Sequence, residues 1–334
     1  MSALLNGRIW SLILLLAAVI FPFLTENQYY LHILSMAFIW AIAVYGLNLI
    51  SGYTGYLSLA HAGFFAVGAY SAGLLMVKTG LNFWLALAAA ILITAVAGFL
   101  IGLVSLRTKE HFFAIYTLCV GYIIYLIIYK WEELTEGVRG LIGIPHPAPL
   151  GPFSFETPRS QYYLLLFFLV LVIWMMKRIV HSLVGSTYTA IRNSEELAEA
   201  IGINVMKQKL VSFVVSTVLA GLAGALYASF VRFIGPDISY VSITFDMLTY
   251  LIVGGIGTLA GPLVGTILIV ALTQSLQFLE DFRMLIFGPL LIALIIFYPR
   301  GIAGGVSSWL HNRRKETVFA AGMERTVNVK GESQ

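Results

Sequence analysis

Five polar side chains lie in a glycine-rich segment, residues 46–63, that joins two long apolar runs. These side chains are Asn48, Ser51, Thr54, Ser58 and His61. Glycines within a membrane can unwind a helix and expose backbone N–H and C=O groups, which bind zwitterions and other small polar solutes. The segment is therefore a candidate translocation pathway. The alternative is close helix packing through small residues, with the hydroxyl groups bonded to their own helix.

A second segment, residues 254–265, combines glycines with a proline. Gly257, Gly261 and Gly265 repeat at four-residue spacing, which would line one helical face and allow two backbones to touch. Pro262 and the surrounding glycines would also break a helix. Both interpretations predict an element of tight packing or a hinge.

One well-marked polar stretch, residues 177–209, interrupts the apolar runs and predicts a short helix of its own, from Arg192 to Gly202. Asn193 is a suitable N-cap, and Glu196 stands at the third helical position, which is the capping-box pattern. Gly202 can end the helix in a left-handed conformation.

The predicted helix has an acidic character and a small apolar face. Its acidic residues are Glu195, Glu196 and Glu199, and its apolar residues are Leu197, Ala198 and Ile201. A helix of about two turns is unstable alone, so it must pack on the ends of its own spans or on a partner. A helix lying on lipid would carry more bulky apolar and basic residues, so the glutamates argue against that alternative.

Several chemistries have no matching pattern in the sequence. A Gly-x-x-x-x-Gly-Lys-Ser/Thr phosphate loop is absent, so the chain is not expected to bind and hydrolyse ATP in the usual way. No metal-ligand spacing and no paired acids within a span occur, and no basic helix interleaved with aromatics suggests nucleic acid. Energy for any transport must come from elsewhere, and the chain is not expected to be an enzyme or to bind a metal.

The composition places the chain in a membrane. Of its 334 residues, 59% are hydrophobic and only 11% are charged, which is too few charges to cover a water-soluble fold of this size. A helix needs about 20 apolar residues to cross the hydrocarbon core. Eight runs approach that length, and two shorter ones, 247–256 and 262–278, are either short spans or half-helices meeting inside the protein. The eight are Leu4–Leu24, Tyr29–Ile50, Tyr56–Val77, Asn82–Leu106, Phe112–Tyr129, Gln161–Met176, Leu210–Val231 and Met284–Tyr298.

These runs predict an all-α bundle of about ten spans, with both termini on one side of the membrane. The positive charges agree with this count, because only six of the 20 Lys and Arg residues then lie on the opposite side: Lys78, Lys130, Arg139, Arg159, Arg232 and Arg283. The richer side is cytoplasmic by the positive-inside rule. It holds the 177–209 loop and both termini.

Residues 1–312 then form a single membrane domain, followed by a polar tail, residues 313–334, that is expected to be disordered. The longest outer loop, residues 130–160, is rich in proline and is expected to be extended chain rather than helix. It serves either as a contact or cover, or as a solvated connector.

The chain resembles a known family in four stretches. They are GLNLISGYTGYLSLAHAGFFAVGAY (46–70), AIRNSEELAEAIGINVMKQKLVSFVVSTVLAGLAGALYA (190–228), LIVGGIGTLAGPLVGTIL (251–268) and FYPRGIAG (297–304). These stretches are similar to the LivM-type permease subunits of bacterial ABC importers, a group that takes up branched-chain amino acids and also includes urea and amide permeases. The resemblance implies a multi-pass protein of the cytoplasmic (inner) membrane, surrounded by membrane lipid.

The resemblance also implies partners and a role for the 192–202 helix. Such a subunit pairs with a second homologous permease, two cytosolic ATPases that hold ATP and magnesium, and a periplasmic solute-binding protein. This chain would bind no cofactor itself. The short helix corresponds to the coupling helix that docks in the ATPase groove, and Glu196, Ala198 and Gly202 loosely match the EAA–x₃–Gly loop of importers, with Leu197 in place of the first alanine.

The implied function is ATP-driven import, with selectivity set largely by the binding protein. Residues 48–61 do not distinguish a branched-chain amino acid from urea or a short amide. Two other classes are weighed against it. A secondary carrier driven by a proton or sodium gradient would transport alone, and a membrane enzyme would need an acid–base pair or a metal site that the sequence lacks.

Overall fold

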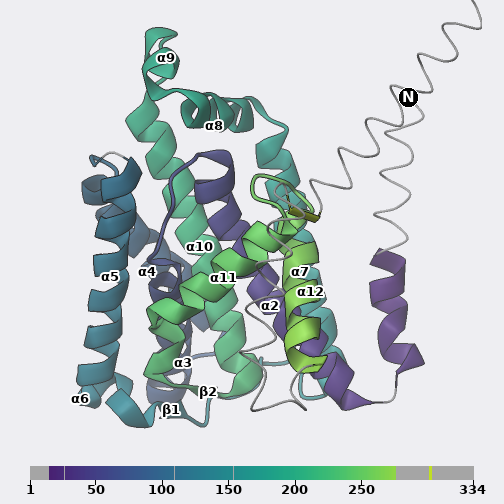
Figure 1. Ribbon diagram of the computed structural model, residues 1–334. Coiled ribbons are helices and arrows are strands. Elements are labelled where there is room, and N and C mark those ends of the chain that lie inside the picture. The colour runs from purple at the N-terminus through teal and green to yellow at the C-terminus, as the bar shows by residue number, and fades with distance from the viewer. Residues whose placement is uncertain (1–14, 26, 109, 153, 276–300, 303–334) are drawn as a thin grey trace, which may run out of the picture.

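The computed structural model describes residues 15–25, 27–108, 110–152, 154–275 and 301–302. Nearly all of the described chain is helical, and the helices form one bundle with α8 and α9 at one end and the small β1–β2 sheet at the other (Figure 1). We call these the α9 end and the β-ribbon end. The helices are α2 (Gln28–Leu47), η1 (Asn48–Tyr53), α3 (His61–Thr79), α4 (Phe83–Ser105), α5 (Glu110–Lys130), α6 (Glu132–Thr135), η2 (Gly137–Arg139), α7 (Pro158–Val180), α8 (Leu183–Asn193), α9 (Glu195–Ala200), α10 (Val205–Val231), η3 (Pro236–Ser239), α11 (Val241–Gly254) and α12 (Gly261–Ser275). The strands are β1 (Leu141–Ile142) and β2 (Phe233–Ile234).

Six helices of the described chain are long and apolar enough to cross a membrane. They are Gln28–Tyr53, His61–Thr79, Phe83–Ser105, His111–Lys130, Pro158–Val180 and Val205–Val231. Each corresponds to a predicted span. Of the predicted span 4–24, the structure describes a helix over Leu15–Leu24. The predicted span 284–298 and the tail 313–334 lie outside the described residues.

The two shorter apolar pieces form a helical hairpin. Helix α11 has 14 residues and is about 21 Å long, against about 30 Å for the hydrocarbon core, and the described part of α12 has 15 residues. The helices lie side by side, and their connecting loop, residues 255–260, packs next to η1. Whether the two pieces are short spans or half-helices stays a prediction, because residues 276–300 lie outside the described residues.

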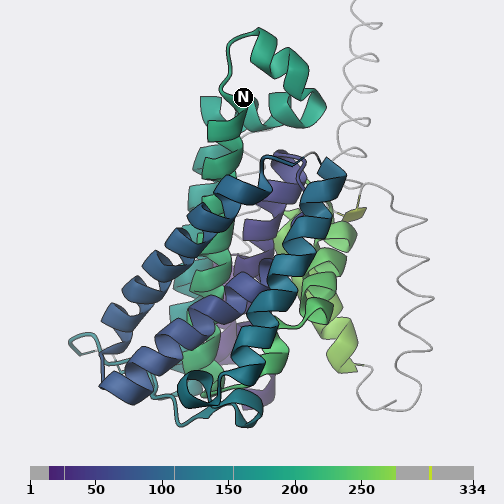
Figure 2. The ribbon, with the colours of Figure 1, turned by 90° about the vertical axis from the view of Figure 1, so that its left-hand side faces the viewer.

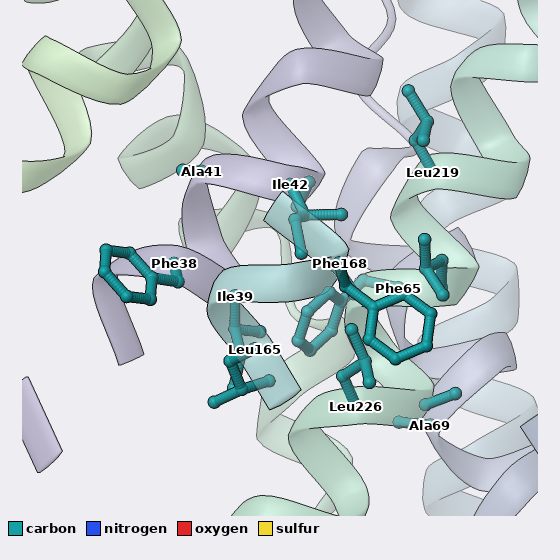
Figure 3. Close-up of a cluster of buried hydrophobic side chains, with 14 of the residues drawn as sticks. Phe38, Ile39, Ala41, Ile42, Phe65, Ala69, Leu165, Phe168, Leu219 and Leu226 are labelled. Atoms are coloured by element: carbon teal, nitrogen blue, oxygen red, sulfur yellow. The ribbon is translucent and has the colours of Figure 1, made fainter. Parts of the chain in front are cut away.

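Helices α2 and α10 form the centre of the bundle, and α4 and α5 lie at its periphery. The most apolar window of α2–η1 is 78% buried, whereas that of α5 is 22% buried. Figure 3 shows the main core, in which side chains from α2, α3, α7 and α10 interlock around Phe65 and Phe168. The apolar surface of α4 and α5 is left for lipid or another subunit.

Small residues bring α3, α4 and α10 close together. A Cβ atom at Gly68 of α3 would overlap the backbone of Gly221 on α10, and one at Gly224 would overlap the carbonyl oxygen of Phe65. With little hydrophobic driving force between helices in lipid, such close backbone contact supplies the van der Waals packing.

The outer loop, residues 130–160, is more structured than the sequence predicts. It contains α6, η2 and β1, and β1 pairs antiparallel with β2, which follows α10. The remainder is extended, as expected, but Ile144 is fully buried, and its carbonyl oxygen accepts a hydrogen bond from Arg232 Nε at 3.1 Å. The loop is therefore a packed cover over the ends of the helices, not a solvated connector.

Candidate functional site

The glycine-rich segment 46–63 joins the crossing helix Gln28–Tyr53 to α3. Helix α2 continues as one π-helical stretch, η1, and the chain then runs through residues 54–60 without regular structure before α3 begins at His61. A Cβ atom at Gly52 would overlap Asn48 Oδ1 and lie 2.7 Å from the nitrogen of Gly257. Gly55 has φ +90°, which is unfavourable for other residues. The glycines therefore create both the bend and the close approach.

Asn48 joins this segment to the α11–α12 loop. Its Oδ1 accepts a hydrogen bond from Gly257 N at 2.8 Å, and its Nδ2 donates to the carbonyl oxygen of Thr258 at 2.8 Å. One turn earlier, Tyr45 donates its hydroxyl proton to the carbonyl oxygen of Leu259 at 2.9 Å. The predicted pathway residue Asn48 thus supplies hydrogen-bond partners to the backbone of the α11–α12 loop. Irregular backbone within a membrane requires such partners.

Two of the predicted hydroxyl groups are paired within the segment. Thr54 Oγ1 donates to the carbonyl oxygen of Leu49 at 3.1 Å and lies 2.6 Å from Ser212 Oγ on α10. Ser51 Oγ donates to the carbonyl oxygen of Tyr56 at 3.2 Å. These bonds stabilise the bend, and a pathway role for Ser51 and Thr54 stays a prediction.

Ser58 and His61 are different, because they are buried without such partners. Neither the Ser58 hydroxyl nor either ring nitrogen of His61 has a hydrogen bond of standard geometry, and both residues are fully buried. The Ala43 backbone is close enough to the His61 ring to interact with it. Among the five predicted pathway residues, these two retain unused polar atoms, and a pathway role for them stays a prediction.

The predicted hinge residues form the packing surface of the α11–α12 hairpin. A Cβ atom at Gly265 would lie 2.7 Å from Gly254 N, and one at Gly261 would overlap the carbonyl oxygen of Gly255. Pro262 stands in the first turn of α12, where its missing N–H costs nothing. Gly257 does not share their helical face, contrary to the spacing argument, because it lies in the loop with φ +73°.

The 177–209 loop contains two helices where the sequence predicted one over 192–202. The first, α8, buries Tyr188 and Ile191 and ends at Asn193, so Asn193 is not the cap of the second. Ser194 is that cap, and its hydroxyl accepts a hydrogen bond from Leu197 N at 3.2 Å. Asn193 was wrong by one residue because Asn and Ser are both strong N-caps and stand next to each other.

Helix α9 ends as predicted. Gly202 has φ +88°, its nitrogen donates to the carbonyl oxygen of Glu199 at 2.9 Å, and Ile203 N donates to that of Ala198 at 3.0 Å. This bonding pattern is a Schellman motif. Ala198 is buried against Ile191 and Val205, which gives the short helix a hydrophobic base.

The outward surface of α9 carries most of the predicted docking residues. Leu197 is 66% exposed and Ile201 is 69% exposed, with the exposed Glu196 and Glu199 beside them. Two exposed aliphatic side chains at i and i+4 on a helix with a fixed base form a small apolar surface with an acidic border. Figure 2 shows that α9 stands beyond the ends of the other helices.

The other predicted docking residues, Arg192 and Glu195, have partners inside the chain. Arg192 Nη1 donates to the carbonyl oxygen of Gly52, at the end of η1. The Glu195 carboxylate accepts from the Tyr56 hydroxyl and from Lys209 Nζ, the latter at 3.1 and 3.2 Å. They therefore connect α8 and α9 to the glycine-rich segment.

Sequence reasoning missed Tyr56 and the inward role of Lys209. Lys209 is only 6% exposed, and its Nζ lies 4.5 Å above the centre of the Tyr56 ring. The available signal was a lysine next to the long apolar run that starts at Leu210. Its partners could not be read from spacing, because Tyr56 precedes it by 153 positions in sequence.

The fold and composition define a multi-pass α-helical membrane protein, with a packed loop at each end. Residues 29–295 match the family described as "Branched-chain amino acid transport system / permease component". The match covers most of the chain, and the chain belongs to this family.

Individual relatives carry similar descriptions. The high-affinity branched-chain amino acid transport system permease proteins LivM of Salmonella typhimurium and of Escherichia coli K12 are each 29% identical over 317 residues, covering 88% of this chain and 74% of the relative. The corresponding LivH protein of Escherichia coli K12 is 25% identical over 287 residues, covering 79% of this chain and 91% of the relative. No solved structure shows a significant match.

Proposed function

We propose that this permease is the LivM-type subunit of an ATP-driven importer that carries branched-chain amino acids. A second, homologous permease would complete the membrane channel; the chain's likeness to both LivM and LivH of one organism supports this pairing. A periplasmic binding protein would deliver the solute at the β-ribbon end, and two cytosolic ATPases would bind at the α9 end. Residues 1–312 would be the permease domain and 313–334 a cytoplasmic tail.

The observation that carries the ATPase proposal is the outward surface of α9. Helix α9 has six residues, is capped at both ends and is packed against the protein through Ala198. Its two exposed aliphatic side chains are suited to insertion into a groove of a soluble partner. Leu197 and Ile201 would fill the groove, and Glu196 and Glu199 would meet basic groups around it. The chain carries no phosphate loop, so ATP and magnesium would be held by that partner.

Charge reversal at this surface tests the proposal. Leu197→Arg and Glu196→Arg should each abolish co-purification of the ATPase subunits and ATP-dependent uptake. Ile142→Arg is the matched control, because Ile142 is 70% exposed at the opposite end of the bundle, and this variant should keep the ATPase bound. If both α9 variants retain the ATPase and uptake, α9 is not the docking helix.

The solute and the energy source need separate measurements. Proteoliposomes containing the complete complex, the binding protein and ATP should accumulate labelled leucine, isoleucine or valine. Accumulation of urea or a short amide instead would assign the chain to the alternative solute class. Vesicles containing only this chain should not accumulate solute under a proton or sodium gradient; if they do, the chain is a secondary carrier.

A further inference from the structure

Helices α8 and α9 hold the bend after η1 at two points, one on each side of its tightest part. We call residues 52–56 the 52–56 turn. At the first residue of the turn, Arg192 at the end of α8 donates to the carbonyl oxygen of Gly52. At its last residue, Glu195 at the start of α9 accepts from the hydroxyl of Tyr56.

The first contact, between Arg192 and Gly52, leaves little room for α8 and the 52–56 turn to move independently. Gly55 stands at the centre of the turn with φ +90°, and a Cβ atom there would lie 3.0 Å from Arg192 Cγ. On the other side of the guanidinium, a Cβ atom at Gly257 would lie 2.8 Å from Arg192 Nη1. The Arg192 side chain therefore runs over the turn and reaches the α11–α12 loop.

The second point is a buried charged contact. Lys209 is 6% exposed, and its Nζ lies 3.1 Å from Glu195 Oε1 and donates to the Tyr56 hydroxyl at 2.8 Å. A buried ammonium without a carboxylate is strongly unfavourable, so Lys209 fixes the position of Glu195. Tyr56 is itself 2% exposed and packs edge-on against Phe113 at 5.2 Å.

The turn leads directly into α3 and is held there by other helices. Leu59 N donates to Thr117 Oγ1 of α5 at 3.0 Å, and Ala62 N donates to Thr244 Oγ1 of α11 at 3.1 Å. A displacement of the 52–56 turn is thus passed to the start of α3, where His61 is buried with unused ring nitrogens. Both attachments to α8–α9 are side-chain bonds that can be removed without altering the backbone.

We propose that Arg192 and Glu195 are positioning residues that transmit movement of α8–α9 to the 52–56 turn, and that Tyr56 and Lys209 complete this link. The inference rests on the proposed function, since it takes an ATPase as the source of the movement. It separates two groups on the same loop: Leu197 and Ile201 contact the partner, whereas Arg192 and Glu195 bond to the 52–56 turn. Loss of the inward pair uncouples ATP hydrolysis from transport, but the ATPase stays bound.

Tyr56→Phe is the most conservative test, because it removes one hydroxyl and keeps the ring against Phe113. In proteoliposomes with the complete complex, the solute transported per ATP hydrolysed should fall about tenfold, the factor expected for losing a hydrogen bond to a charged group. Co-purification of the ATPase should be unchanged. Tyr122→Phe is the matched control, because Tyr122 is 49% exposed on α5 and should keep the wild-type ratio.

Two further variants keep the test decisive if one of them folds poorly. Arg192→Met removes the first contact, and Glu195→Gln combined with Lys209→Gln removes the buried pair without leaving one charge uncompensated. Both should lower the same ratio and retain the ATPase. The proposal is overturned if the ratio stays at the wild-type value in these folded variants, or if they lose the ATPase as Leu197→Arg does. A wild-type complex without uptake would instead refute the proposed function.

Discussion

The bend between α2 and α3 is held from two sides by different chemistry. The α11–α12 loop holds it through its main chain, since Gly257 N–H and the Thr258 carbonyl oxygen both bond to Asn48. Helices α8 and α9 hold it through long charged side chains, Arg192 and Glu195. The first contact depends on glycines and allows little displacement. The second contact acts through side chains with several rotatable bonds, so its hydrogen bonds can remain formed while the helices move.

This difference indicates which contact belongs to the scaffold and which to the moving part. Close-packed backbone behaves as a rigid unit, because any displacement of it produces overlap or unpaired polar groups. A side-chain link of several rotatable bonds can follow a displaced helix. We therefore expect substitutions on the α11–α12 side to affect folding, and substitutions on the α8–α9 side to affect coupling.

The largest effect is expected from Gly52→Ala, which attacks the rigid contact. The added methyl group would overlap Asn48 Oδ1 and press on Gly257 N, and overpacking of this kind costs about 1–3 kcal/mol or more. The midpoint of thermal unfolding in detergent should fall sharply. Gly235→Ala is the control, because its nearest neighbours would lie 3.7 Å away. Equal stability of the two variants would show that the α11–α12 loop is not tightly packed on η1.

Asn48→Ala should have the next largest effect. It leaves Gly257 N–H and the Thr258 carbonyl oxygen without their partner, and an unsatisfied buried polar group costs about 1–3 kcal/mol. The same thermal measurement applies, with the exposed Asn193→Ala as the control. If Asn48→Ala is as stable as wild type but transports poorly, Asn48 belongs to the pathway and not to the scaffold.

Arg192→Met should change thermal stability less than either of those variants. The Arg192 side chain is partly in solvent, and exposed charged contacts typically contribute about 0.2–1 kcal/mol. Lys207→Met, on the exposed start of α10, is the matched loss of one positive charge. A drop in stability as large as that of Gly52→Ala would remove the distinction between the two sides of the bend.

The smallest effect is expected from acidification, which acts at the β-ribbon end. Burial, and then the nearby Arg232, lower the pKa of His146 from 6.5, and Gln161 Nε2 donates to His146 Nδ1 at 2.8 Å. Because the folded pKa is lowered, the stabilisation is complete above pH 6.5 and decreases as the pH falls towards the folded pKa. Once the intrinsic pH dependence of amide exchange is divided out, the protection of residues 143–152 and 154–157 should therefore decrease as the pH is lowered from 7.5 to 5.5.

The matched variant for that experiment is His146→Gln. It keeps a hydrogen-bonding side chain but does not titrate in this range, so the protection of this loop should not change with pH. Exchange in residues 48–56 serves as the internal reference for wild type. A response of the outer loop that is the same in both proteins would show that His146 is not the titrating group.

The sequence was sufficient for the parts of the structure that depend on apolar runs and local caps. It predicted the six long spans, the loops at opposite ends and the left-handed end of α9 at Gly202, because hydropathy and capping are encoded within a few residues. It also marked both glycine-rich segments as places where a helix could break. The cap of α9 was misplaced from Ser194 to Asn193, and α8 was missed, although its buried residues Tyr188 and Ile191 stand at helical spacing.

What the sequence could not predict were the long-range pairs. Tyr56, Glu195 and Lys209 meet only because α3, α9 and α10 come together at one end, and no local pattern records this. Their contact gives Glu195 partners inside the chain that its place on the predicted docking helix did not indicate. In the same way, the order in the outer loop comes from β1 pairing with β2, 92 positions further along.

The length of α10 has a consequence for how the membrane and a soluble partner share this end of the molecule. Its 27 residues extend about 40 Å, roughly 10 Å more than the hydrocarbon core. Figure 2 shows α9 beyond the ends of the other helices, and a surplus of this length at its end of α10 would place it beyond the hydrocarbon core. A rigid protein several nanometres wide could then approach Leu197 and Ile201 without displacing phospholipids, so shortening α10 by one turn should weaken its access even with α9 unchanged.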